Sequence, residues 1–86
     1  MKSEEVSAGQ WVVVSSLGSE AGLAIKADHL RVRKVGVLGT VIGPVPGHGG
    51  DVFWVRHSES KDVGAYASDE LSPGPNPTSK MSLLFG

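Results

Sequence analysis

Short runs of β-branched and aromatic residues recur along the chain, and polar or glycine-rich segments separate them. In the second run, Leu30 and Val32 alternate with His29, Arg31 and Arg33, which predicts a strand with one apolar face and one basic face. Runs of this length and composition, bounded by turn residues, are typical of strands. The pattern predicts strands at 11–14, 29–34, 36–43, 51–57 and 63–67.

The segments between these runs carry turn and loop residues. Gly39, inside the third run, predicts a bend or a bulge where the sheet curls. We expect 15–28 to be a long irregular loop, and the pattern leaves open whether 20–26 contains a helical turn. Ser68 can cap a short turn that delivers Leu71 to the core.

The chain divides into three parts. Residues 1–8 are polar and acidic and are expected to form a flexible N-terminus, whereas 9–73 hold all the predicted strands. Residues 74–86 form a Pro-rich linker, which is stiff and extended, followed by an apolar tail. Because large apolar side chains are costly to leave in water, we expect the tail at 81–85 to dock on this domain or on a second copy.

Length and composition restrict the class of protein. At 86 residues the chain has room for one domain, and its 12 glycines and 5 prolines favour turns over long helices. It has no cysteine with which to form disulfides, and its apolar runs are far shorter than the ~20 residues that span a bilayer. We therefore expect a cytoplasmic protein with no membrane segment.

Four or five short strands in a chain of this size are too few for two packed sheets, but they can curl into a small barrel. The fold class expected is all-β, a small five-stranded SH3-like barrel with a Pro-rich C-terminal tail. From about Gly9 to Pro73 the sequence resembles the group of SH3-like barrels that contains KOW-type and mind-bomb-type modules. The segments that carry this resemblance are 36–41, 52–55 and Tyr66 with Glu70-Leu71.

A narrower resemblance concerns the segment 63–66. The plasmid-borne type II dihydrofolate reductases are also small SH3-like barrels, and a Val-Gln-Ile-Tyr segment lines the pore of their tetramer, where folate and NADPH meet. Val63 and Tyr66 match this motif, whereas Gly64 and Ala65 stand where the Gln and Ile would contact the ligands. The resemblance implies an oligomeric reductase, which we keep as a third hypothesis because the two replacements remove those contacts.

Aromatic residues predict a binding surface. Neighbours on a strand point to opposite faces, so one of Phe53 and Trp54 belongs to the core and the other to the surface. An exposed ring near Tyr66 would form a platform for a protein or peptide, although both rings could instead cover the two open sides of a thin barrel. The predicted partner-binding residues are Trp54, Tyr66, Arg56, His57 and His48, with the loop 44–50 as a rim.

Basic residues provide the alternative of a KOW-like nucleic-acid-binding module. Side chains on one strand face could contact phosphates, yet the net charge of −1 argues against a dedicated nucleic-acid binder. A solvated edge strand defended by charge accounts for the same residues. The residues of this alternative are Arg31, Arg33, Lys34 and Arg56.

Catalytic and metal-binding motifs are not apparent in the sequence. No Gly-x-Ser-x-Gly elbow is present, and we expect neither catalytic residues nor a cofactor. His29, His48 and His57 match no zinc-binding spacing and are expected to be solvated surface residues. The first hypothesis is a non-enzymatic binding module for a protein or peptide partner, with the 81–85 tail as a route to a homo-oligomer.

Overall fold

The computed structural model describes residues 1–19, 23 and 25–76. Within these residues it is mostly strand, with every strand paired antiparallel in one sheet of order β4-β3-β2-β1-β5. No helix in this part of the chain is long and apolar enough to cross a membrane. The elements are η1 (Ser3–Glu5), β1 (Trp11–Val14), α1 (Ala27–Arg31), β2 (Leu38–Pro44), β3 (Val52–His57), β4 (Val63–Ala67), η2 (Ser68–Glu70) and β5 (Leu71–Pro73).

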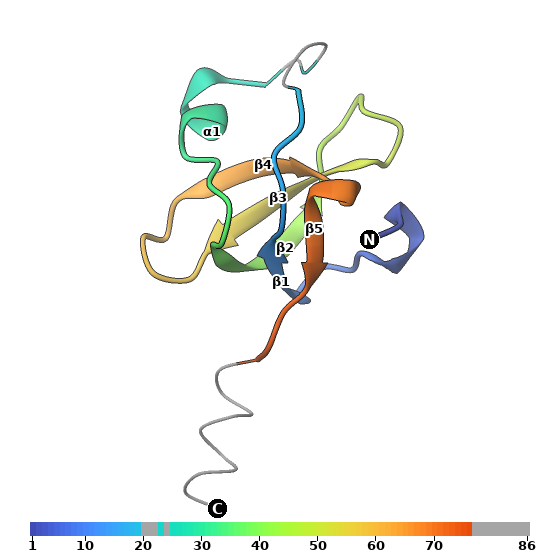
Figure 1. The fold of residues 1–86 in the computed structure, drawn as a ribbon. Helices are drawn as coiled ribbons and strands as arrows, with labels where there is room; N and C mark the ends of the chain where they lie inside the picture. Colours follow the sequence, from blue (N-terminus) through green and yellow to red (C-terminus); the bar gives the residue numbers. More distant parts are fainter. Residues whose placement is uncertain (20–22, 24, 77–86) are drawn as a thin grey trace, which may run out of the picture.

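The sheet is strongly twisted, and its concave face holds the core. In Figure 1, β1 and β5 run steeply across the direction of β3 and β4. Residues of the two edge strands, β4 and β5, therefore reach the same core. Alternation along the strands supplies the side chains, as in β1, where Val12 and Val14 are buried. The core contains Val6, Val12, Val14, Val41, Phe53, Val55, Tyr66 and Leu71.

A second, smaller cluster lies on the other face of β3 and β4. Of the two neighbouring aromatic residues, Phe53 is buried in the main core. Trp54 is half-buried against the second cluster, on the opposite face of β3. Both rings therefore cover apolar surface, which is the alternative that the sequence left open. The second cluster consists of Val45, Val52 and Ala65, with Leu23, Ile25 and Trp54 packed against it.

The bulge expected at Gly39 lies three residues further along β2. Gly39 pairs regularly with His57, and the register shifts between Val41 and Gly43, so that Ile42 is the extra residue and is 44% exposed. Gly39 is needed for a different reason. A Cβ at this position would lie 2.4 Å from the carbonyl oxygen of Arg56, so only glycine lets β2 and β3 approach here.

The strand predicted at 29–34 is wrong, because this region contains the short helix α1. A six-residue alternation of apolar and polar residues is also compatible with a helical turn, and tertiary contacts decide between the two. The Nδ1–H of His29 donates to the carbonyl of Val63 at 2.7 Å, which holds α1 against β4. Residues 20–26, where a helical turn was left open, lie partly outside the described residues, and α1 begins at Ala27.

The fifth strand comes from the segment after η2 rather than from 29–34. Leu71 enters the core as predicted, but it does so from β5, which pairs with β1 through to Pro73. Pro73 is therefore the last residue of the sheet. The apolar tail at 81–85 lies outside the described residues.

Two of the N-terminal residues contact the sheet or the core. Val6 is buried in the core, and the α-ammonium group of Met1 donates to the carbonyls of Ser68 at 3.1 Å and Leu71 at 2.8 Å. The carbonyl of Leu71 belongs to β5, and the carbonyl of Val63, which accepts from His29 of α1, belongs to β4. Both edge strands thus have carbonyls occupied by groups from outside the sheet, which limits strand addition there.

Candidate functional site

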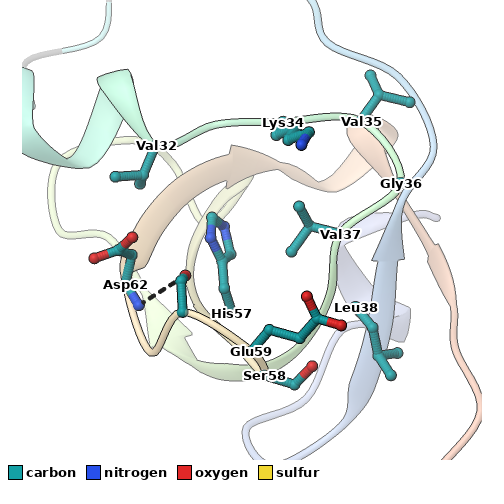
Figure 2. Close-up of a pocket in the computed structure, with 11 residues that line it drawn as sticks. Val32, Lys34, Val35, Gly36, Val37, Leu38, His57, Ser58, Glu59 and Asp62 are labelled. Carbon is teal, nitrogen blue, oxygen red and sulfur yellow. Dashed lines mark hydrogen bonds between the residues drawn. The ribbon is translucent and has the colours of Figure 1, made fainter.

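A cavity opens between the α1–β2 connection and the turn that joins β3 to β4. Its volume is about 480 Å³, within the range of about 300–1,000 Å³ that is typical of ligand sites. Figure 2 shows the two segments facing each other across the opening. The first wall, at 32–38, is mostly apolar, and the second, at 57–62, is mostly polar. The side chains that matter below are Val35, Val37, Leu38 and Lys34 on the first wall and His57, Glu59 and Asp62 on the second.

The imidazole of His57 stands among these lining residues (Figure 2). It comes from the inner face of β3, which makes His57 only 4% exposed although it borders the cavity. Its Nε2 lies 2.8 Å from the hydroxyl oxygen of Tyr66, and that oxygen also accepts the backbone N–H of Lys34 at 3.2 Å. A hydrogen-bonded chain therefore links the cavity to the core and ties down the wall at Lys34.

Arg33 and Glu70 form a buried ion pair next to the ring of Tyr66. The guanidinium of Arg33 sits 5.6 Å from the centre of the Tyr66 ring and donates to the carboxylate of Glu70, and both charged side chains are at most 5% exposed. Glu70 also accepts the backbone N–H groups of Gly18 and, at 2.8 Å, Ala67. The carboxylate thus joins three separate stretches of the chain, and Tyr66 separates it from the cavity.

Burial shifts the pKa values of both members of the His57–Tyr66 pair. Desolvation lowers the pKa of His57 below its ordinary value, although the negative charge of Asp62 opposes this shift. Desolvation also raises the pKa of the Tyr66 hydroxyl, against the hydrogen bond from Lys34 and the charge of Arg33. Near pH 7 the imidazole is therefore neutral and the phenol is protonated. The hydrogen bond between His57 and Tyr66 and the bond from Lys34 to Tyr66 can both form in these protonation states.

The lowered pKa of His57 predicts that the folded chain loses stability as the pH falls below about 6.5. There the unfolded chain takes up a proton that buried His57 resists, so the free energy of unfolding falls by up to about 1.4 kcal/mol per pH unit for this one group. Urea unfolding at about pH 7 and about pH 5.5 measures the slope. We expect His57→Gln to flatten it and His48→Gln to retain it; an unchanged slope in His57→Gln would assign the effect to other groups.

The packing of the His57 and Tyr66 side chains requires a glycine at position 64. Gly64 lies on the inner face of β4, and a Cβ there would come within 2.8 Å of Cε2 of Tyr66 and 3.2 Å of Nε2 of His57. The glycine therefore makes room for the two rings. The glutamine that the type II reductases carry at the matching position has no space in this arrangement.

Two of the predicted partner-binding residues are not on the surface. Tyr66 is fully buried and His57 nearly so, because both point to the concave face of the sheet. The expectation that His57 is a solvated histidine is therefore wrong. The structure brings these two residues together through the hydrogen bond between Nε2 and the hydroxyl group, with His57 lining the cavity and Tyr66 buried in the core, and they do not form an exposed platform.

The other predicted partner-binding residues lie elsewhere. Trp54 is half-buried on the outer face of β3, with its ring centre 4.9 Å from that of His29 in an edge-to-face contact. Arg56 is exposed on that same outer face. His48 lies in the loop after β2, where its Nδ1 is 3.0 Å from the carbonyl oxygen of Pro46. These residues do not share one surface with His57 and Tyr66.

The residues of the nucleic-acid alternative are also separated. Arg31 is exposed on α1 and forms an ion pair with Asp28, whereas Arg33 is buried against Glu70. Only Lys34 borders the cavity. No group of three or more His, Asp or Glu side chains that could hold a metal ion occurs in the described ranges 1–19, 23 and 25–76.

Sequence reasoning missed the cavity and the Arg33–Glu70 pair. Thirty-seven positions separate the two charged residues, so no local pattern could show that they form a pair. The signal that was available is Glu70 in the Glu-Leu-x-Pro segment, where a charged residue directly precedes a core leucine. Comparison with protein-family models, with curated proteins and with solved structures finds no match to this chain.

Proposed function

We propose that this chain is an SH3-like barrel that binds a peptide or protein segment in the cavity between 32–38 and 57–62. The barrel is supported by the main core cluster, to which the edge strands β4 and β5 contribute Tyr66 and Leu71. The observation that carries the binding role is the cavity itself, of about 480 Å³ with an apolar wall facing a polar one. Sites of this character bind ligands through apolar contact and a few placed polar groups.

Val35 is the feature that most favours a macromolecular ligand. Its side chain is 51% exposed, more than that of any other large apolar residue in the described part of the chain, and it stands on the cavity wall. An exposed apolar residue beside a cavity offers a contact point for a side chain of the partner. Burial of such contacts stabilises a complex by roughly 25 cal/mol per Å² of apolar surface.

The two other hypotheses receive less support. A nucleic-acid partner needs several cations on one surface, and the four basic residues proposed for it are divided among an exposed ion pair, the core, the cavity wall and the outer face of β3. A type II reductase needs a side chain that reaches a ligand from the position of Gly64, where a Cβ would meet Tyr66.

The test is selection of random twelve-residue peptides by immobilised protein, followed by titration of the selected peptide into isotope-labelled protein with detection of amide NMR shifts. We expect the largest shifts at 34–38 and 58–62, and we expect Val35→Asp to abolish binding. Ile42→Asp is the matched control, because Ile42 is a similarly exposed β-branched residue outside the cavity. Failure to select any peptide, or shifts centred around Ile42, would refute the proposal.

A further inference from the structure

The cavity contains a polar group with an unused bonding position. His57 is more than nine-tenths buried and lines the cavity, and its Nε2 is engaged by Tyr66. Among the residues that the structure describes, none provides a hydrogen-bond partner for the other ring nitrogen, Nδ1. Because His57 borders the open cavity, this nitrogen faces solvent, and a ligand oxygen can replace water as its partner.

The hydrogen bonds around Tyr66 determine whether Nδ1 donates or accepts. The Tyr66 oxygen already accepts the N–H of Lys34, so its own proton is available to donate, and Nε2 of His57 is the acceptor at 2.8 Å. A neutral imidazole that accepts at Nε2 carries its proton on Nδ1. The cavity therefore presents an Nδ1–H donor, which calls for an oxygen acceptor on the ligand.

The charges at the cavity indicate what surrounds that acceptor. Glu59 and Asp62 are exposed on the polar wall, and neither forms an ion pair with a lysine or arginine of the described residues. Lys34 is the single basic side chain on the opposite wall. Among the lining residues two carboxylates face one ammonium group, since Lys61 of the same turn does not line the cavity. This balance disfavours an anionic ligand and favours a cationic group between Glu59 and Asp62.

We infer that the ligand is a peptide segment in which a lysine or arginine adjoins an apolar residue. The apolar side chain packs on Val35 and Val37, a main-chain carbonyl accepts Nδ1–H of His57, and the basic side chain lies between Glu59 and Asp62. This inference rests on the proposed function and adds to it the chemistry of the partner. The same arrangement of charge disfavours nucleic acids and acidic peptides as ligands.

The first test concerns the unliganded protein and needs no peptide. Imidazole ¹⁵N shifts distinguish a protonated Nδ1 from a protonated Nε2, and we expect the Nδ1–H form for His57 at about pH 7. Tyr66→Phe removes the hydroxyl that selects this form, so we expect that variant to show a mixture of the two. Finding Nε2–H in the parent protein would overturn the assignment of a donor to the cavity.

The second test is a charge reversal. We expect peptides selected by the parent protein to be enriched in lysine or arginine beside an apolar residue, and Glu59→Lys/Asp62→Lys to weaken them about tenfold or more and to select acidic residues instead. Glu4→Lys/Asp69→Lys is the matched control, since it makes the same charge change at exposed positions outside the cavity. We expect it to retain the parent preference.

The outcomes separate this inference from the proposed function. Selected peptides that bind the cavity without a basic residue, or that keep their affinity in Glu59→Lys/Asp62→Lys, would refute the partner chemistry while the binding site stands. Tighter binding of a mixed-sequence single-stranded oligonucleotide than of any peptide would refute both. Absence of any selected peptide would refute the proposed function itself.

Discussion

Glu70→Ala is expected to lower the free energy of unfolding by about 3–5 kcal/mol, the cost typical of removing one partner of a buried ion pair. The carboxylate of Glu70 accepts from the guanidinium of Arg33 and from the backbone N–H groups of Gly18 and Ala67. Alanine removes all of these acceptors at once. Since a domain of this size is stable by only about 5–15 kcal/mol, the loss is a large fraction of the total.

Guanidinium unfolding followed by tryptophan fluorescence measures this effect, because the chain has two tryptophans, one on β1 and one on β3. The chain supplies its own control in Asp28 and Arg31, an arginine–carboxylate pair whose side chains are both 74% exposed. We expect Asp28→Ala to cost no more than about 0.5 kcal/mol. Equal losses in the two variants would show that burial does not set the contribution of the pair.

A milder replacement removes the charge and keeps part of the hydrogen bonding. Glu70→Gln retains one acceptor oxygen, which can serve either Gly18 or Ala67 but not both, and it removes the negative charge that faces Arg33. In a cycle with Arg33→Met, the double variant is expected to be more stable than Glu70→Gln alone, because the buried positive charge is then also gone. Strict additivity of the two single changes would contradict a coupled pair.

The strands could be predicted from the sequence because each one is a short run of β-branched and aromatic residues bounded by turn residues. The predictions of 11–14 and 63–67 match β1 and β4, and the prediction of 51–57 differs from β3 by one residue at its start. The segment 29–34 failed for a physical reason: its alternation is short, and the bond from His29 to Val63, which favours a helical turn, joins residues far apart in sequence. Local pattern cannot contain such a contact.

The candidate site was less predictable, since it is made of contacts between distant segments. Tyr66 and His57 were both selected from the sequence, but alternation alone could not say that both face the concave side of the sheet. Gly64 was noted only as a departure from a reductase motif. The structure gives this glycine a positive role, because its missing side chain is the space that the His57–Tyr66 pair occupies.

Tyr66→Ala is the second change with a large expected effect, at about 3–5 kcal/mol of the free energy of unfolding for a large buried aromatic residue. Tyr66 is fully buried, and its ring contacts both Arg33 and His57. Tyr66→Phe keeps the ring and loses only the hydroxyl, and we expect it to cost about 1–3 kcal/mol because Nε2 of His57 and the N–H of Lys34 both lose a partner. Chemical unfolding of the two variants measures the difference.

The phenylalanine variant also tests how the core holds the cavity in shape. The Tyr66 hydroxyl accepts a hydrogen bond from the backbone N–H of Lys34. This bond connects the 32–38 wall of the cavity to the core. We expect amide hydrogen exchange at Lys34 to accelerate in Tyr66→Phe by more than the global loss of stability explains. The amide of Val41, which donates to Gln10 within the sheet, is the internal control. If both amides accelerate equally, the hydroxyl stabilises the fold as a whole, and the wall of the cavity depends on other contacts.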